Sequence, residues 1–575
     1  MTIHKRKLSD PDLARGLYYG TLAAALVAGA FTLAVVGVLL VNWARDQVAT
    51  PLDNPQLAAM KAALAKDRKN VSLKQEIRDL DLTLRSEHFR RLDAAGRAQW
   101  LLVAGGAVFV LGLKSARTLR QKLPHPSLQT VLASVEARRA SFARWAVAAV
   151  TILVAGAAGV LALRGGGGPT QAPVQEATFP TPEEIAKNWP YFRGPGGLAT
   201  SAYTNVPASW NGKTGDGILW KTKVPLPGEN SPVVWGNRLF LTGADKKQRA
   251  VYCFDTGTGA LLWTGALAGI PGSPATAPKV DENTGYACPT AVTDGRCVYA
   301  IFANGDVAAF DFEGRRVWAR NLGVPKNTYG YASSLTMYQN RVLVLMDQTP
   351  VEEGRSKLLA LDTATGRTVW EARRPVRDSW ASPIVATVAG RVQVLTIADP
   401  WVIGYDPARG RELWRANVLG GDVAPSPVCA KDTVFAVQPN SKVIALKADG
   451  QGDVTAKGLV WKIDENIPDI VSPLATADFL FTLTTPGLLV CSNAKDGKKV
   501  WEKDFEKEGR ASPSLVGNRV YVVLEDGTTV MVAASREFKE LGRAELGEKV
   551  HASPAFLDGR IYLRGLKHLY AIGKK

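Results

Sequence analysis

The sequence contains little of what disulfide, haem and metal chemistry require. It has only five cysteines and five histidines in 575 residues. Because the number of cysteines is odd and no two are adjacent, we expect free, buried thiols and no disulfide framework. The histidines, at positions 4, 88, 125, 551 and 568, do not cluster at metal-ligand spacing, and no Cys-x-x-Cys-His motif occurs. A disulfide-stapled domain, a zinc site of the usual spacing and a c-type haem are therefore excluded.

Local motifs for nucleophilic catalysis and for nucleotide binding are also missing. The sequence has no Gly-x-Ser-x-Gly elbow and no phosphate-binding loop. The net charge is +17, but residues 1–170 hold 23 Lys and Arg against 11 Asp and Glu, and the remainder holds 47 against 42. Residues 171–575 are therefore close to neutral and do not carry the charge pattern of a nucleic-acid-binding surface. We expect no nucleic acid among the partners.

Three apolar stretches in the first 170 residues predict transmembrane helices. Residues 17–41 are 25 positions without a charge, which is long enough to span a bilayer; a cleaved signal peptide is the alternative. Residues 145–163 form a second uncharged stretch between two arginines. Residues 98–113 number only 16, but the flanking Arg97 and Lys114 can snorkel and lengthen the reach of this helix.

The distribution of basic residues predicts the topology of this anchor. The N-terminus and residues 114–144 are rich in Lys and Arg, as cytoplasmic segments are, whereas residues 44–97 hold 11 basic and 8 acidic residues. We therefore expect a multi-pass inner-membrane anchor at residues 1–168, with the N-terminus inside and the rest of the chain in the periplasm. Residues 55–97 predict a helical hairpin, either a protruding rod or a hairpin on the membrane surface. Gly165–Gly168 and the prolines that follow them predict a flexible linker at residues 169–187.

The remainder of the chain repeats a four-stranded unit. Residues 472–505 show four short strands separated by turn residues, which make one antiparallel sheet that needs neighbours. A Ser-Pro pair or a close variant recurs every 40–57 residues, the period of a propeller blade. It occurs at Ser231, Cys288, Ser333, Ser382, Ser426, Ser472, Ser512 and Ser553. This predicts eight blades over residues 188–575.

A second signature, an Asp or Asn followed by Gly and then Trp at four-residue intervals, closes several of these units. It occurs at Asp255–Gly259–Trp263, Asp362–Gly366–Trp370, Asp406–Gly410–Trp414 and Asn493–Gly497–Trp501, with Asp311–Gly314–Trp318 one residue shorter. The acidic or amide side chain can bind backbone donors of a turn, Gly supplies a left-handed position, and the indole offers a flat ring to the next blade.

These runs resemble the tryptophan-docking motif of the PQQ-like β-propeller repeat family, which includes the quinoprotein alcohol dehydrogenases and the BamB-type outer-membrane assembly proteins. The resemblance covers residues 188–575 and implies an all-β eight-bladed β-propeller, here preceded by an α-helical region with three transmembrane helices. The docking residues it implies are Trp220, Trp263, Trp318, Trp370, Trp414, Trp461 and Trp501.

The last unit has only three strands before the chain ends. An unused strand, Gly217–Val224, stands upstream and is similar to Gly458–Asp464, which ends another unit. We expect Gly217–Val224 to complete the last blade and to close the ring, because closure removes both exposed sheet edges. The lead-in, Asn188–Gly197, should pack on the propeller. Residues 512–546 carry Leu541 and Gly542 in place of a docking Trp, which predicts the weakest contact in the ring.

The residues two positions before the Ser-Pro starts should surround one end of the central tunnel. The candidates for ligand or cofactor binding are Glu229, Tyr286, Tyr331, Trp380, Arg510 and His551, with Ala424 and Ile470 between them. Aromatic rings, an acid, a base and a histidine can hold a flat anionic ligand by stacking and charge. The alternative is a set of ordinary loop residues without a ligand.

The resemblance implies two different functions. A quinoprotein dehydrogenase would have pyrroloquinoline quinone (PQQ) stacked on a Trp, a calcium ion, a catalytic Asp and a pair of adjacent cysteines, and this sequence lacks that pair. A BamB-like member would be a non-enzymatic scaffold. We expect a membrane-anchored periplasmic scaffold, or an accessory subunit of a membrane complex, that contacts other membrane or periplasmic proteins and has no cofactor or metal. The alternative is a PQQ-dependent oxidoreductase of alcohols or sugars, with calcium.

Overall fold

The computed structural model describes residues 11–48, 108–118 and 179–574 of the chain, which divides into two compact units, Met1–Pro173 and Val174–Lys575. In the first unit, α1 spans Pro11–Val48 and residues 108–118 are helical. Within the described ranges, α1 is the one helix long and apolar enough to cross a membrane, over Tyr18–Val36, although an N-terminal signal sequence would meet the same criteria.

The other two predicted spans fall largely outside the described residues. The span predicted at 98–113 is described only from residue 108, and the span at 145–163 and the hairpin at 55–97 lie outside the described ranges. The helical residues 108–118 pack closely on α1. A Cβ added to Gly112 would lie 3.0 Å from Cβ of Ala25, and one added to Gly29 would lie 2.9 Å from the ring of Phe109.

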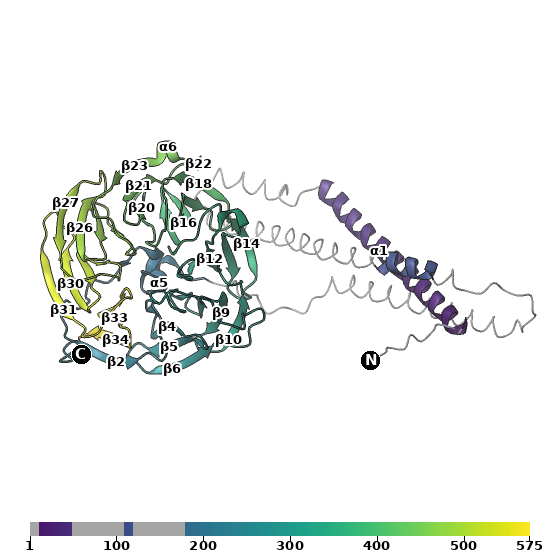
Figure 1. Ribbon diagram of the computed structural model, residues 1–575, viewed down its shortest axis with the longest axis horizontal. Helices are drawn as coiled ribbons and strands as arrows, with labels where there is room; N and C mark the ends of the chain where they lie inside the picture. The colour runs from purple at the N-terminus through teal and green to yellow at the C-terminus, as the bar shows by residue number, and fades with distance from the viewer. Residues whose placement is uncertain (1–10, 49–107, 119–178, 575) are drawn as a thin grey trace, which may run out of the picture. The chain divides into compact units, whose positions relative to one another are not determined.

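The second unit is an eight-bladed β-propeller, as the repeats predict (Figure 1). Blades 1 to 4 each contain four antiparallel strands. Blade 1 has β3 (Val233–Trp235), β4 (Arg238–Ala244), β5 (Arg249–Asp255) and β6 (Leu261–Ala266); blade 2 has β7 (Val292–Thr293), β8 (Cys297–Ile301), β9 (Asp306–Asp311) and β10 (Arg316–Asn321); blade 3 has β11 (Thr336–Tyr338), β12 (Arg341–Met346), β13 (Lys357–Asp362) and β14 (Thr368–Arg373); blade 4 has β15 (Ile384–Val388), β16 (Arg391–Ala398), β17 (Trp401–Tyr405) and β18 (Glu412–Asn417).

Blades 5 to 8 follow the same plan. Blade 5 has β19 (Val428–Ala430), β20 (Thr433–Gln438), β21 (Lys442–Lys447) and β23 (Leu459–Ile463), with β22 (Gly452–Asp453) and α6 (Thr455–Gly458) inserted; blade 6 has β24 (Leu474–Ala475), β25 (Phe479–Leu483), β26 (Leu488–Asn493) and β27 (Lys499–Asp504); blade 7 has β28 (Ser514–Val516), β29 (Arg519–Val523), β30 (Thr528–Ala533) and β31 (Glu540–Glu545); blade 8 has β32 (Ala555–Leu557), β33 (Arg560–Arg564) and β34 (His568–Gly573). The middle strands are almost wholly buried because each blade packs between two others.

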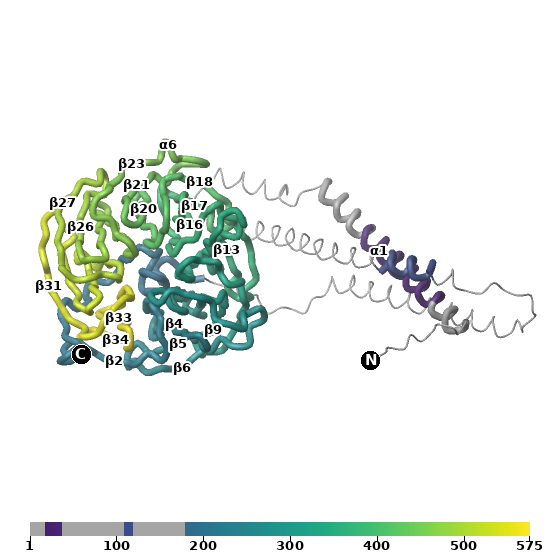
Figure 2. Tube along the Cα trace, in the orientation of Figure 1, coloured from purple at the N-terminus to yellow at the C-terminus, as the bar shows by residue number. Residues whose placement is uncertain are grey.

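The fourth strand of blade 8 comes from upstream, as predicted. β2 (Ile218–Lys223) pairs antiparallel with β34, with Trp220 opposite Ala571. Figure 2 shows these two strands, from opposite ends of the propeller sequence, side by side at the chain's C-terminal end. The ring is thereby closed without a free sheet edge between its first and last blades.

Five of the tryptophans bridge to the next blade in one way. The Nε1 of Trp220 donates to the carbonyl of Thr256 at 3.0 Å, and a Cβ added to Gly259 would lie 2.5 Å from the Trp220 ring. The position therefore requires glycine, because any side chain would collide with the indole. Its φ of +71° also lies in the left-handed region that favours glycine. The corresponding donations run from Trp263 to Phe312, Trp318 to Thr363, Trp461 to Ala494 and Trp501 to Ser535.

Trp370 and Trp414 make different contacts. Trp370 lies against Gly410, but its Nε1 has no hydrogen-bond partner among the described residues. Trp414 is 0% exposed and its Nε1 donates to Gln393 Oε1, in its own blade, at 2.7 Å. Blade 5 has no Asp–Gly–Trp turn to receive this indole, and β22 instead pairs with β18 in parallel across that junction.

The junction between blades 7 and 8, which lacks a docking Trp, is covered by a segment from before β2. A Cβ added to Gly542 would lie 2.8 Å from the carbonyl oxygen of Ala208, and one added to Gly217 would lie 2.9 Å from Cβ of Trp210. Trp210 is buried, and Tyr521 donates its hydroxyl proton to Pro207. Trp210 therefore occupies, from a different point in the sequence, the junction where the repeat predicts a Trp at 541 or 542.

The lead-in packs across the propeller, as expected. α5 (Pro182–Ala186) begins with a capping box between Thr181 and Glu184 and lies within the ring of blades in Figure 1. Trp189 then pairs with Val234 of blade 1, η3 (Pro195–Gly197) contacts blade 4, and β1 (Thr200–Ser201) pairs with β28 of blade 7. The segment thus ties distant blades together.

Candidate functional site: the propeller mouth

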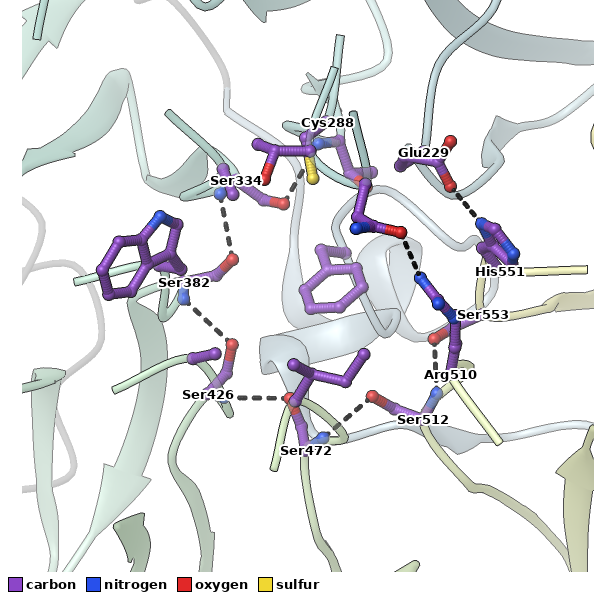
Figure 3. Close-up of a pocket in the computed structure, with 18 of the residues that line it drawn as sticks. Glu229, Cys288, Ser334, Ser382, Ser426, Ser472, Arg510, Ser512, His551 and Ser553 are labelled. Carbon is purple, nitrogen blue, oxygen red and sulfur yellow. Dashed lines mark hydrogen bonds and ion pairs between the residues drawn. The ribbon is translucent and has the colours of Figure 1, made fainter. Parts of the chain in front are cut away.

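A closed ring of eight hydroxyl groups surrounds the central tunnel where the first strands begin. The backbone N–H of each member donates to the side-chain oxygen of the member in the next blade, at 2.9–3.1 Å, and the eighth donates to the first (Figure 3). The members of this hydroxyl ring are Ser231, Thr290, Ser334, Ser382, Ser426, Ser472, Ser512 and Ser553. The recurrent serine of the sequence therefore links the blades at the axis.

Two blades use a residue other than the one that the repeat indicates. In blade 2 the ring member is Thr290, two residues after Cys288, and in blade 3 it is Ser334, one residue after Ser333. Ser333 donates its hydroxyl proton to Ala381 instead. A hydroxyl is a stronger acceptor than a thiol, and in blade 2 the offset brings the Thr290 hydroxyl into the ring in place of the Cys288 thiol.

Substitution of Ser426 by Ala should destabilise the propeller by about 1–3 kcal/mol, because the buried N–H of Ser382 would lose its acceptor. Ser426→Thr is the matched control, since Thr290 already serves in the ring. Chemical denaturation of both variants makes the comparison. Equal stability of the Ala and Thr variants would show that the ring does not contribute.

The cavity above the hydroxyl ring has a volume of about 530 Å³ and is bounded by loops from the blades and by Phe192 of the lead-in. Of the six candidate residues, Glu229, Trp380, Arg510 and His551 line it, as do Ala424 and Ile470. Tyr331 instead lies in the core and donates its hydroxyl proton to Leu345, and Tyr286 packs beside the core between blades 1 and 2. We call the opening of this cavity the mouth.

On one side of the mouth, charged groups from blades 1, 7 and 8 pair with one another. His551 Nδ1 lies 2.7 Å from Glu229 Oε2, and its Nε2 lies 3.5 Å from Glu525 Oε1. Arg510 and Lys549 also pair with Glu525, at 3.3 and 3.2 Å. Burial by itself would raise the pKa of Glu525, but the hydrogen bond from Lys549 and the positive charge of Arg510 lower it to about 2.

The other side of the mouth holds residues that the sequence analysis did not single out. Asp281, Asp422 and Asp469 line the cavity, and we call these three carboxylates the acidic arc. Tyr329 packs against Trp380, with ring centroids 4.8 Å apart and ring planes tilted by 42°, and donates its hydroxyl proton to Asp422 at 3.1 Å. Neither the three carboxylates nor Tyr329 occupy the position two residues before a Ser-Pro start. The repeat therefore gave no signal for them.

A loop from the first blade junction reaches across the mouth. Asn283 accepts a hydrogen bond from Arg510 Nη1 at 3.1 Å, although the two residues are 227 positions apart. The same loop is held at its base, where the Asp281 N–H donates to the carbonyl of Tyr329. The loop therefore connects the acidic arc with the paired charges on the opposite side.

The thiol nearest to these groups is in its protonated form at neutral pH. Cys288 lines the cavity, and burial together with the charge of Glu229 raises the pKa of its thiol to about 12. Because the thiolate is the nucleophile, this residue is not activated for covalent catalysis. All five cysteines are free thiols, as expected, but Cys288 and Cys297 are only partly buried.

The residues of the mouth do not form a ready site for the quinone and calcium that the resemblance implies. Trp380 is only 9% exposed, its Nε1 donates to Gly330, and Tyr329 lies against its ring. A calcium ion takes six to eight oxygen ligands. In the described part of the chain, no group of three or more His, Cys, Asp or Glu side chains is arranged to hold a metal ion. Glu229 is already held by His551.

Comparison with known proteins gives a family and a fold. The model of a family described as outer membrane protein assembly factor BamB matches residues 194–349, 289–468 and 451–537, which together exceed half of the chain. Tetrathionate hydrolase from Acidithiobacillus ferrooxidans is 25% identical over 264 residues, which are 43% of this chain and 50% of that protein. The chain thus spans half the length of that curated relative.

Two solved structures of other proteins are similar. BamB from Moraxella catarrhalis has 15% identity and a TM-score of 0.45, over 62% of this chain and 99% of that one. A quinohemoprotein alcohol dehydrogenase from Pseudomonas putida HK5 has 14% identity and a TM-score of 0.51, over 69% of this chain and 82% of that one. At this identity the second similarity shows the propeller fold alone.

Proposed function

Because this chain belongs to the family of the outer membrane protein assembly factor BamB, we propose that it is a membrane-anchored scaffold whose propeller binds other membrane or periplasmic proteins. The observation that carries the proposal is that the reactive side chains of the mouth are already engaged with one another. Glu229 pairs with His551, and Arg510 pairs with Glu525. General acid–base catalysis needs such a group placed against a substrate, whereas a paired set makes a fixed surface.

In this proposal the first unit is the anchor, residues 1–168, with residues 169–187 as the linker and residues 188–575 as the propeller. Three helices cross the inner membrane, the N-terminus lies in the cytoplasm and the propeller lies in the periplasm. The apolar helix α1 supports membrane placement. The close contact of α1 with residues 108–118 at Gly29 and Gly112 supports the second span, because membrane helices approach one another through small residues.

Cysteine labelling in intact spheroplasts tests this topology. A cysteine introduced at Asp496, on an exposed turn of blade 6, should react with an impermeant maleimide, whereas one introduced at Ser127 should react only after permeabilisation. The native chain, with its five free thiols, provides the background. Protection of the Asp496 position in intact spheroplasts would place the propeller in the cytoplasm and contradict the three-span arrangement.

Purification of the tagged full-length chain from its native host in a mild detergent tests the scaffold itself. The expected result is a reproducible set of membrane or periplasmic proteins in near-equal amounts, absent from a tag-only control. A chain that purifies without partners and carries the absorbance of a bound quinone would contradict the proposal.

A PQQ-dependent oxidoreductase of alcohols or sugars is the second candidate, because the quinohemoprotein dehydrogenase shares the propeller fold. In that case the cofactor would lie in the mouth, where Glu229 would have to separate from His551 and Trp380 from Tyr329 to contact it, and the quinone would supply the oxidising group. The partial match with tetrathionate hydrolase adds hydrolysis of tetrathionate as an activity to assay, by following the loss of tetrathionate with purified protein.

A further inference from the structure

The mouth is acidic although the propeller around it is not. Glu229, Asp281, Asp422 and Asp469 line the cavity, against Arg510 and His551. By contrast, residues 171–575 as a whole hold 47 Lys and Arg against 42 Asp and Glu. A cleft lined by one sign of charge focuses the electric field and concentrates ions of the opposite sign. The mouth is therefore suited to a cation, not to the flat anionic ligand that the sequence alone suggested.

The unbalanced charge lies in the acidic arc. On the opposite side Glu229 is hydrogen-bonded to His551, and Glu525 forms ion pairs with Arg510 and Lys549. In the arc, Asp422 has one cation nearby, Arg377, at 4.0 Å, and Arg377 lies closer to Asp399, at 3.5 Å.

The other two carboxylates of the arc accept hydrogen bonds from neutral groups. Asp281 is bonded to Asn283, and Asp469 to Asn440. Within the part of the chain that the structure describes, neither forms an ion pair. Three carboxylates therefore face the cavity with almost no positive charge to balance them.

Aromatic and apolar surface lies on the same rim. Tyr329 is 44% exposed and packs at a tilt against Trp380, and Ile470 is 39% exposed. An aromatic face beside carboxylates attracts ammonium and guanidinium groups, and the stem of a Lys or Arg side chain covers apolar surface at the same time. A peptide segment that alternates basic and apolar residues complements this combination of charge and exposed rings.

We propose that the acidic arc and the Tyr329–Trp380 pair bind an extended basic segment of a partner protein, with the charged end of a Lys or Arg side chain beside Asp422 and its stem over the exposed part of the Tyr329 ring. The cavity, of about 530 Å³, admits side chains and not a folded domain. This inference rests on the proposed scaffold function and names the chemistry of the partner that the mouth receives. The hydrogen bond between Tyr329 and Asp422 fixes the ring and the carboxylate relative to one another.

The test is binding of a fluorescein-labelled eight-residue peptide, alternating Lys and Leu, to the full-length chain in a non-ionic detergent. The variant Asp281→Asn/Asp422→Asn/Asp469→Asn keeps an oxygen acceptor at each position and removes three charges. The matched control, Glu313→Gln/Glu371→Gln/Asp496→Asn, removes three exposed charges elsewhere on the propeller. Binding is measured by fluorescence anisotropy, and far-UV circular dichroism checks the folding of each variant.

The mouth variant should raise the Kd for the peptide by about tenfold or more, and the control by less than about twofold. The single variant Asp469→Asn should raise it by about two- to fivefold, which keeps the test decisive if the triple variant does not fold. Equal weakening by the mouth and control variants, or preference for the peptide with Glu in place of Lys, would overturn the proposal. The proposal would also be overturned if spermidine displaced the peptide and bound more tightly than the peptide does, since the ligand would then be a small polycation.

Failure of this proposal and failure of the scaffold are distinguishable. A chain that co-purifies with partners but does not bind the Lys peptide leaves the scaffold standing and removes the mouth as the basic-segment site. A chain that purifies alone, and binds neither partner nor peptide, contradicts both.

Discussion

Replacing Trp414 by Ala is expected to lower the free energy of unfolding of the propeller by about 3–5 kcal/mol, the usual cost of truncating a fully buried aromatic side chain. The indole is 0% exposed and packs in the core shared by blades 4 and 5. Its removal also leaves Gln393 Oε1 without its donor. Gln393 in turn donates to the carbonyl of Ala448, in blade 5, so the loss affects the link between the two blades.

Two other variants make this result specific. Trp414→Phe should cost less than the Ala variant, because it keeps most of the ring volume and loses chiefly the hydrogen bond. Trp370→Ala should also cost less, since that indole is only half-buried and its Nε1 bonds to nothing in the described chain. Chemical denaturation ranks the three variants. A loss of under about 1 kcal/mol for Trp414→Ala would mean that the tryptophan does not hold the blades together.

Asp347→Asn is expected to destabilise the propeller by a similar amount, about 3–5 kcal/mol, because it leaves a buried guanidinium without its counter-charge. Arg374 and Asp347 are both 0% exposed, with Arg374 Nε 2.6 Å from Asp347 Oδ1. Arg374 Nη1 also donates to Thr396 and Tyr405 of blade 4. Burial by itself would lower the pKa of Arg374, but the Asp347 carboxylate and Tyr405 hold it above its ordinary value.

The double variant Asp347→Asn/Arg374→Met separates the charge from the packing. Removing both partners takes away the uncompensated charge, so the double variant should be more stable than Asp347→Asn alone. The comparison is again made by denaturation. If the double variant is no more stable than the single one, the destabilisation comes from lost packing and the charge argument is wrong.

The sequence was sufficient for the fold because the repeat is local and recurs. Four strands, a turn and a docking Trp each occupy a short stretch, so eight blades and the closing strand at Gly217–Val224 could be predicted without any long-range contact. The replacement of the missing Trp by Trp210 could not be predicted, because Trp210 reaches its junction from outside the repeat. Ring members Thr290 and Ser334 were missed for a related reason: the offset varies between blades.

The mouth was predicted only in part. The position two residues before each Ser-Pro start does bring Glu229, Trp380, Arg510 and His551 to one cavity. The acidic arc comes from loops of different lengths between blades, where no periodic pattern exists, and its three carboxylates change the sign of the charge that the cavity presents. The residues two positions before the Ser-Pro starts could not by themselves show that the cavity is acidic. The charge of a cavity depends on every loop that reaches it.

Incubation of the purified full-length chain with pyrroloquinoline quinone and calcium, followed by assay with simple alcohols and aldoses and a dye acceptor, tests the central claim most directly. The scaffold account predicts no stoichiometric binding of the quinone and no turnover above that of Glu229→Gln. Stoichiometric binding with turnover that is abolished by Glu229→Gln or Trp380→Ala would contradict it and would make the mouth an active site.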